Sequence, residues 1–165
     1  MGQLIDGIWH EKDLPRVNAG GEFERKQSEY RSHLGSEKYK AEAGRYHLFV
    51  NAGCPWAYRA ILYRSIKNLS GLITMSYSRP AAGTEGWTFG EPEPLLGAVH
   101  MHQVYTADNS SFTGRCTVPV LWDKESNSIV NNESADIIRM FNSAFDSISG
   151  VDQIDYYPEP LRARI

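Results

Sequence analysis

The stretch YHLFVNAGCPWAYRAILYRSI, residues 46–66, decides the fold of this chain. Strand signals at residues 46–52 give way to residues 55–68, where apolar side chains recur at the spacing of a helix. Pro55 suits the first turn of that helix, because the N–H that proline lacks would have no acceptor there. The pattern therefore predicts a strand, a sharp corner and a helix, with Cys54 at the corner.

Further elements follow along the chain in a recognisable order. They are a strand at 73–78, a long connection at 79–115 with a short helix around 99–105, strands at 117–122 and 128–131, and an amphipathic helix at 133–145. The order strand, helix, strand, connection, strand, strand, helix is that of the thioredoxin-like fold. We therefore predict an α/β chain of the thioredoxin-like type, βαβ-α-ββα.

The chain divides into three parts by composition. Residues 1–44 are polar and charged, and we expect an extended N-terminal arm with a short helix near Glu24 to His33. Residues 45–150 form the thioredoxin-like domain. Residues 151–165 begin a connection. In the last predicted helix, Asn132 is the expected cap, and the expected apolar face consists of Ala135, Ile138, Phe141 and Phe145.

Composition excludes several functional classes. The 165 residues are 41% hydrophobic and 22% charged, with a net charge of −3, which predicts neither nucleic-acid binding nor binding to an anionic membrane. No apolar run has the length of a membrane span, and the N-terminus lacks the pattern of a signal peptide. The two cysteines predict a reducing compartment, the cytoplasm.

Cys54 is the candidate nucleophile. The thiolate is the reactive form of cysteine, and the unpaired N–H groups at a helix N-terminus favour it. The motif Cys54-Pro55-Trp56-Ala57 has alanine where a dithiol enzyme has its second cysteine, so glutathione is the expected resolving thiol. Two alternatives remain: Cys54 is a small buried apolar residue, or Cys116 is the resolving thiol.

Two further motifs suggest how a thiol peptide would bind. In GRCTVPVLWD, we expect a cis Pro119 that leaves the backbone of Val118 to pair with a cysteinyl unit; the alternative is a trans proline at a sheet edge. Glu133 and Ser134 open the last helix and suit an ammonium and a carboxylate, although simple capping also explains them. No metal site is predicted, because His100 and His102 lack further ligands at a familiar spacing.

Motifs along the whole chain resemble a known family. MGQLIDGIW, GGEFERKQSEYR, CPWAYR, GWTF, FTGRCTVPVLWDKESNSIVNNESADIIRMFNSAF and YYPEPLR are similar to segments of glutathionyl-hydroquinone reductases, the Xi class of glutathione transferases. The resemblance implies a thioredoxin-like domain joined to an all-helical domain, commonly in a homodimer. It also implies reduction of glutathionyl-hydroquinones to hydroquinones, with glutathione as co-substrate and no metal.

The same resemblance assigns roles to individual residues. Cys54 would be the nucleophile, and Pro119 the structural cis-proline. The residues that would bind glutathione are Trp87, Arg115, Cys116, Thr117, Val118, Glu133 and Ser134. Two departures stand out: Cys116 lies where an apolar residue is usual, and the chain ends in YYPEPLRARI, where the family's connection into the helical domain begins. Tyrosines of that helical domain have no counterpart in this sequence.

Three hypotheses follow from these departures. The first is a family reductase, completed by a partner polypeptide or impaired by truncation. A glutathione-dependent thiol transferase, or a domain like dehydroascorbate reductase, is the second. The third is an inactive glutathione-binding fragment whose exposed apolar surface requires a partner.

Overall fold

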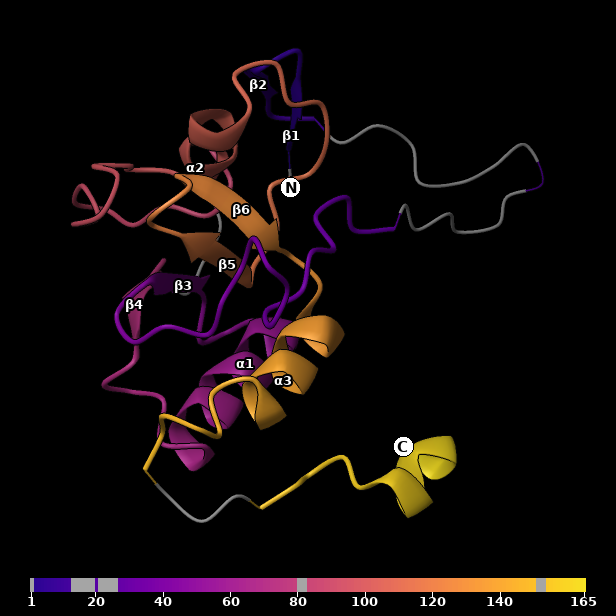
Figure 1. Cartoon of the computed structure of the whole chain (residues 1–165). Helices are drawn as coiled ribbons and strands as arrows, with labels where there is room; N and C mark the ends of the chain where they lie inside the picture. The colour runs from indigo at the N-terminus through magenta and orange to yellow at the C-terminus, as the bar shows by residue number, and fades with distance from the viewer. Residues whose placement is uncertain (1, 13–19, 21–26, 80–82, 151–153) are drawn as a thin grey trace. The chain divides into compact units, whose positions relative to one another are not determined.

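The structure is a computed structural model that describes residues 2–12, 20, 27–79, 83–150 and 154–165 (Figure 1). The chain forms two units. Met1–Glu29 and Tyr77–Thr117 make up unit 1, whereas Tyr30–Ser76 and Val118–Ile165 make up unit 2. The candidate nucleophile Cys54 lies in unit 2.

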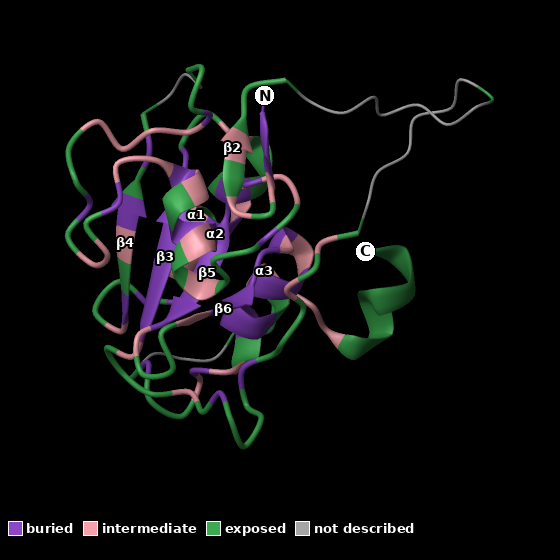
Figure 2. Cartoon of the chain, turned by 90° about the horizontal axis from the view of Figure 1, so that it is seen from above, coloured by how far each residue is buried: buried purple, intermediate pink, exposed green. Residues whose placement is uncertain are grey.

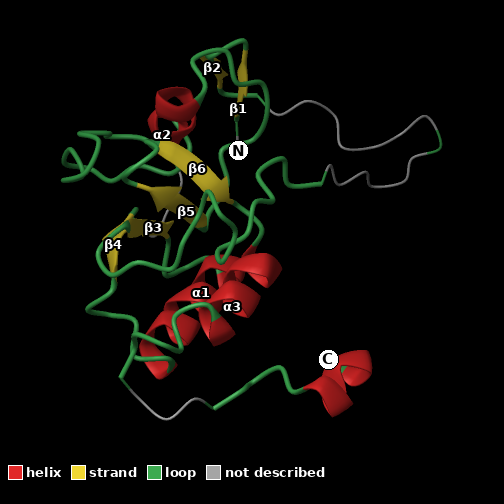
Figure 3. Ribbon diagram, in the orientation of Figure 1, coloured by secondary structure: helices red, strands yellow, loops and turns green. Residues whose placement is uncertain are grey.

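Unit 2 is built on a four-stranded sheet with the order β4-β3-β5-β6 (Figure 3). The strands are β3 (Tyr46–Val50), β4 (Ile73–Tyr77), β5 (Val120–Asp123) and β6 (Ser128–Asn131). β5 pairs antiparallel with both β3 and β6, and Phe49 lies opposite Val120. The predicted strand–helix–strand and strand–strand–helix halves are confirmed.

Two helices of unit 2 pack against one another, α1 (Pro55–Ile66) and α3 (Ser134–Ser143). All of β3 and β5 is buried, as is one face of α3 (Figure 2). The buried side chains of α3 include Ile137, Met140 and Phe141, whereas Ala135 and Ile138 are half-buried. The predicted face was therefore wrong at its N-terminal end, because Ile137 rather than Ile138 faces the core. Across the described residues, no helix has the length and apolar character needed to cross a membrane.

The segment before β3 differs from the prediction. Residues 27–33 do not form the expected helix, and residues 24–26 lie outside the described residues. Instead, residues 30–32 run along β6: the Ser32 N–H donates to the Val130 carbonyl at 3.1 Å, and the Asn132 N–H donates to the Tyr30 carbonyl at 3.1 Å. This pairing satisfies backbone groups that an edge strand would expose, which outweighs the local helix preference.

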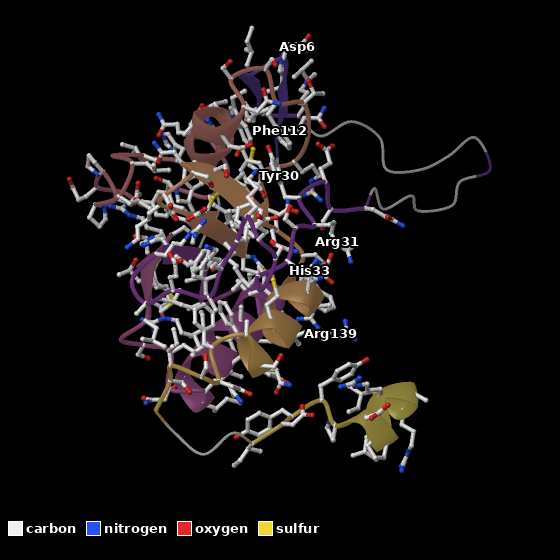
Figure 4. All side chains as sticks on the ribbon, in the orientation of Figure 1. Asp6, Tyr30, Arg31, His33, Phe112 and Arg139 are labelled. Atoms are coloured by element: carbon white, nitrogen blue, oxygen red, sulfur yellow. The ribbon has the colours of Figure 1, made fainter. Side chains whose placement is uncertain are left out.

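Arg31 and Arg139 tie unit 2 together at its surface (Figure 4). The Arg31 guanidinium forms an ion pair with Asp136 of α3. The Arg139 guanidinium lies over the Tyr157 ring, 4.6 Å from its centroid. Tyr157 precedes a short 3-10 helix, η1 (Glu159–Arg164).

Unit 1 contains a β-hairpin that the sequence interpretation did not include. It is formed by β1 (Gln3–Ile5) and β2 (Ile8–His10). Asp6 and Gly7 join the strands with φ of 48° and 77°, the positive values of a two-residue type I′ turn. The Gly7 N–H donates to the carbonyl of Phe112 at 3.0 Å. The helix of this unit, α2, spans Met101–Asp108 rather than 99–105.

His47 in β3 gives the fold a pH dependence that can be measured. Its ring is buried between the hydroxyls of Thr74 and Ser76, at 2.7 and 3.0 Å, and burial lowers its pKa to about 4. Because the unfolded chain takes up this proton near pH 6.5, we expect stability to fall as the pH drops from 6.5 to 4, by on the order of 3 kcal/mol. Urea unfolding at a series of pH values measures this loss.

His47→Gln should flatten that part of the pH profile, because it removes the titrating group. His10→Gln, at an exposed position of β2, is the matched control and should keep the wild-type slope. An unchanged slope in His47→Gln would contradict the assignment.

Candidate functional site

Cys54 is the N-cap residue of α1 and has the extended backbone typical of that position, with φ of −95° and ψ of 115°. Asn51, which is fully buried, shapes the corner before it. The Asn51 side chain accepts from the Gly53 N–H at 2.8 Å, and its carbonyl accepts from the Cys54 N–H at 3.2 Å. These bonds turn the chain from β3 into α1 and leave the Cys54 thiol half-buried rather than enclosed.

The carbonyl of Val118 faces the thiol of Cys54. The Sγ–O distance is 3.9 Å, and both residues belong to unit 2. The Val118–Pro119 peptide bond is cis. β5 begins at Val120, so Val118 lies just before the part of the chain that pairs in the sheet. A backbone segment therefore lies beside the sulfur, in the position where an extended peptide could pair with it.

Glu133 and Ser134 open α3 in unit 2. Glu133 is the N-cap residue and its carboxylate accepts from the Ala135 N–H at 3.2 Å, so the expected cap Asn132 was wrong by one residue. The physical reason is the preceding turn: the Asn131 side chain accepts from the Glu133 N–H at 2.7 Å and positions Glu133 for capping. Ser134 is the first residue of the helix and is 4% exposed.

Arg59 of α1 links the helix that follows Cys54 to Ser134 at the start of α3. The sequence interpretation missed this residue. Its Nε and Nη2 donate to the Ser134 hydroxyl at 3.1 and 2.7 Å. Its guanidinium also lies over the indole of Trp56, 5.0 Å from the ring centroid. The available signal was the helical spacing in CPWAYR, which puts Arg59 and Trp56 three residues apart on one face of α1.

A family profile described as "Glutathione S-transferase, N-terminal domain" matches residues 53–144, from the corner before Cys54 through α3. The chain belongs to this family. The matched range includes Cys54, Val118, Glu133 and Ser134, whose arrangement in unit 2 is described above. Membership agrees with the thioredoxin-like fold expected from the sequence.

Individual family members extend the comparison over the whole chain. Glutathionyl-hydroquinone reductase PcpF of Sphingobium chlorophenolicum is 44% identical over 170 residues, covering 100% of this chain and 54% of that protein. Glutathionyl-hydroquinone reductase YqjG of Escherichia coli is 42% identical over 180 residues, covering 100% of this chain and 55% of that protein. The chain thus spans about half the length of the curated relatives it matches.

Solved structures of family members also align with nearly the whole of this chain and with about half of their own length. The glutathione-bound structure of YqjG from Escherichia coli K-12 aligns with a TM-score of 0.82 at 38% identity, covering 99% of this chain and 52% of that chain. The Xi-class glutathione transferase of Natrialba magadii aligns with a TM-score of 0.86 at 33% identity, covering 100% and 51%. The resemblance to Xi-class transferases inferred from the sequence is confirmed.

The remaining candidate residues of this chain belong to unit 1. Thr117 is held by Tyr105 of α2, whose hydroxyl donates to the Thr117 carbonyl at 3.0 Å and accepts from the Thr117 N–H at 3.2 Å. The carbonyl of Trp87, a half-buried residue, accepts from the Met101 N–H at 2.8 Å. Arg115 is half-buried and Cys116 is buried. Tyr105 was not among the candidates, although its hydroxyl holds the backbone of Thr117.

Among the described residues, no group of three histidine, cysteine, aspartate or glutamate side chains could hold a metal ion. His100 and His102 stack with their ring centroids 5.2 Å apart, and His102 pairs with Glu85 at 3.2 Å. These contacts account for the two histidines as packing around α2.

Cys116 and Cys54 should differ sharply in reactivity. Burial raises the pKa of the Cys116 thiol to about 12, so its thiolate fraction near neutral pH is roughly 10³-fold below that of an ordinary cysteine. We expect iodoacetamide to alkylate Cys54 in the folded protein and to spare Cys116 until the chain is denatured. Peptide mass spectrometry distinguishes the two sites, and equal labelling of both in the folded protein would contradict this expectation.

Proposed function

We propose that the protein containing this chain reduces glutathionyl-hydroquinones to hydroquinones, and that this chain supplies the glutathione site and the thiol chemistry. One observation carries the proposal. In this member of the transferase family, the half-buried Cys54 is the N-cap of α1, and the carbonyl oxygen of Val118 lies 3.9 Å from its sulfur. Two full-length relatives that align with the whole chain have the name glutathionyl-hydroquinone reductase.

The proposed reaction has two displacement steps. In the first, the Cys54 thiolate attacks the sulfur of the glutathionyl group, a sulfur–sulfur bond forms, and the carbon–sulfur bond to the ring breaks. The ring carbon keeps the electron pair of that bond and takes a proton, so the ring is reduced and the two sulfurs are oxidised. In the second step, the thiolate of another glutathione attacks the mixed disulfide, which restores Cys54 and releases oxidised glutathione.

The glutathione peptide would lie along the N-terminal ends of α1 and α3. Val118 would pair through its backbone with the cysteinyl unit, which brings the peptide sulfur to Cys54. Glu133 would bind the ammonium of the γ-glutamyl group, and Ser134 its carboxylate. The family resemblance also assigns Trp87, Arg115, Cys116 and Thr117 to glutathione binding, and that assignment stays a prediction.

The test is a turnover assay with 2-glutathionyl-hydroquinone and glutathione, followed by chromatography of the released hydroquinone. We expect hydroquinone and oxidised glutathione in equal amounts, with a Cys54 adduct of one glutathionyl group in the intact mass before the second glutathione is added. Disulfide exchange with oxidised glutathione but no hydroquinone would support a thiol transferase instead. Absence of an adduct under both conditions would overturn both functions.

A further inference from the structure

Arg59 makes an unusual contact with Ser134. Two of its N–H groups, on Nε and Nη2, converge on one hydroxyl oxygen at 3.1 and 2.7 Å. A guanidinium has donors and no acceptor, so the hydroxyl oxygen must accept both bonds. The contact occupies the acceptor side of a hydroxyl that is nearly removed from water.

This leaves the Ser134 hydroxyl with a single chemical role. A serine hydroxyl has one proton to donate and two lone pairs to accept with. Since Arg59 occupies the lone pairs, any further partner must accept the Ser134 proton. A carboxylate oxygen satisfies this requirement, whereas an ammonium does not.

The contact of Arg59 with Glu133 is weaker than its contact with Ser134. Nη2 lies 3.8 Å from Oε1 of Glu133, and the two side chains are 33% and 20% exposed. An ion pair that is partly solvated at this distance contributes at most about 1 kcal/mol. The main effect of Arg59 is therefore on the serine rather than on Glu133.

The guanidinium is held in place before any ligand binds. It stacks over the Trp56 indole at 5.0 Å, which restrains the long side chain of Arg59. Arg59 and Trp56 both belong to α1, whereas Ser134 begins α3, and these two helices pack together. The donor is thus preorganised by rigid elements, which lowers the entropic cost of binding.

We propose that Arg59 is a positioning residue that orients the Ser134 hydroxyl as a donor toward the α-carboxylate of the γ-glutamyl group. It thereby makes the site selective for a peptide with a carboxylate at that end. This inference rests on the proposed glutathione site and adds to it a residue that determines specificity.

The test is a cycle of two protein variants and two peptides. Glutathione is compared with 4-aminobutanoyl-cysteinyl-glycine, which differs from it by loss of the α-carboxylate. For the wild type, we expect calorimetry to show about 10- to 100-fold weaker binding of the second peptide. Arg59→Met should bind glutathione more weakly than the wild type by a similar factor. Within this variant, the dissociation constants of the two peptides should differ by less than about threefold.

Three further variants separate positioning from a general structural effect. Arg59→Lys keeps a cationic donor group without the two-nitrogen geometry of the guanidinium and should recover part of the discrimination, whereas Ser134→Ala should match Arg59→Met. Arg139→Met, an equal change of charge on the exposed face of α3, should bind both peptides like the wild type. With saturating glutathione, kcat of Arg59→Met should stay within about threefold of the wild type while KM rises.

The outcomes distinguish this inference from the proposed function. If the wild type binds glutathione and Arg59→Met loses as much affinity on removal of the carboxylate as the wild type does, Arg59 has no positioning role and the proposed function stands. If the wild type binds neither peptide, the glutathione site itself is wrong and this inference fails with it. Thermal melting of each variant checks that the fold is retained.

Discussion

Cys54→Ser should lower the rate of hydroquinone formation by at least about 10³-fold. A serine hydroxyl is a much weaker nucleophile near neutral pH, and an oxygen at this position cannot form the mixed disulfide with glutathione. The substitution exchanges one atom at the N-cap of α1, a position where serine is itself a preferred residue, so the helix should be retained. Steady-state turnover and intact mass spectrometry together measure the effect.

The same variant should still bind glutathione, because Val118, Glu133 and Ser134 are unchanged. A normal dissociation constant combined with lost turnover would show that Cys54 acts in the chemical step. Ser65→Ala, at an exposed position near the end of α1, is the control and should keep wild-type turnover. Turnover of Cys54→Ser within tenfold of the wild type would mean that another group attacks the glutathionyl sulfur.

The sequence predicted the part of unit 2 that local patterns encode. The corner at Cys54 follows from an apolar strand, a proline that suits the first turn and a helical spacing of apolar residues, all within about twenty residues. β6 and the body of α3 follow from equally local signals. Each element was predicted because its own side chains determine which face is buried.

Long-range pairing accounts for what the sequence did not reveal. Residues 30–32 join the edge at β6, which lies about one hundred residues further along the chain, and no periodicity in the segment indicates that partner. The hairpin at Asp6 and Gly7 was missed for another reason, since its strands have three residues each and produce almost no alternation. The Asp-Gly pair between apolar residues was the usable signal.

In the candidate site too, residues in local motifs could be predicted, whereas a residue that acts through a distant contact could not. Cys54, Val118 and Ser134 stand in recognisable motifs, so they could be named in advance. Arg59 could not be assigned, because its role depends on the contact with Ser134, 75 residues away. An arginine on an amphipathic helix ordinarily faces solvent, and only the packing of α1 on α3 turns this one toward the hydroxyl.

Arg45→Met should destabilise unit 2 by about 3–5 kcal/mol. Arg45 immediately precedes β3 and donates from Nε and Nη2 to the two carboxylate oxygens of Asp123, both at 2.8 Å. Asp123 is fully buried at the end of β5. Removing the guanidinium leaves a buried carboxylate without its cation, and the uncompensated charge is what makes the substitution costly. Urea unfolding near neutral pH measures the loss.

Titration of Asp123 provides an independent check on the same pair. Burial raises the pKa of this carboxyl, but hydrogen bonds from Arg45, Ser126 and the Glu125 N–H outweigh it and lower the pKa to about 2. The wild type should therefore lose stability as the pH falls from 3.8 toward 2, because the unfolded chain takes up the proton first. In Arg45→Met, the pKa of Asp123 is no longer lowered by the guanidinium, so this variant should lose the stability contributed by the Asp123 carboxylate at a higher pH than the wild type does. Glu42→Gln removes one of the two exposed carboxylates that pair with Arg45, the one 3.4 Å away, and should cost less than about 1 kcal/mol. If Arg45→Met and Glu42→Gln cost the same, the bidentate pair with Asp123 does not stabilise the fold.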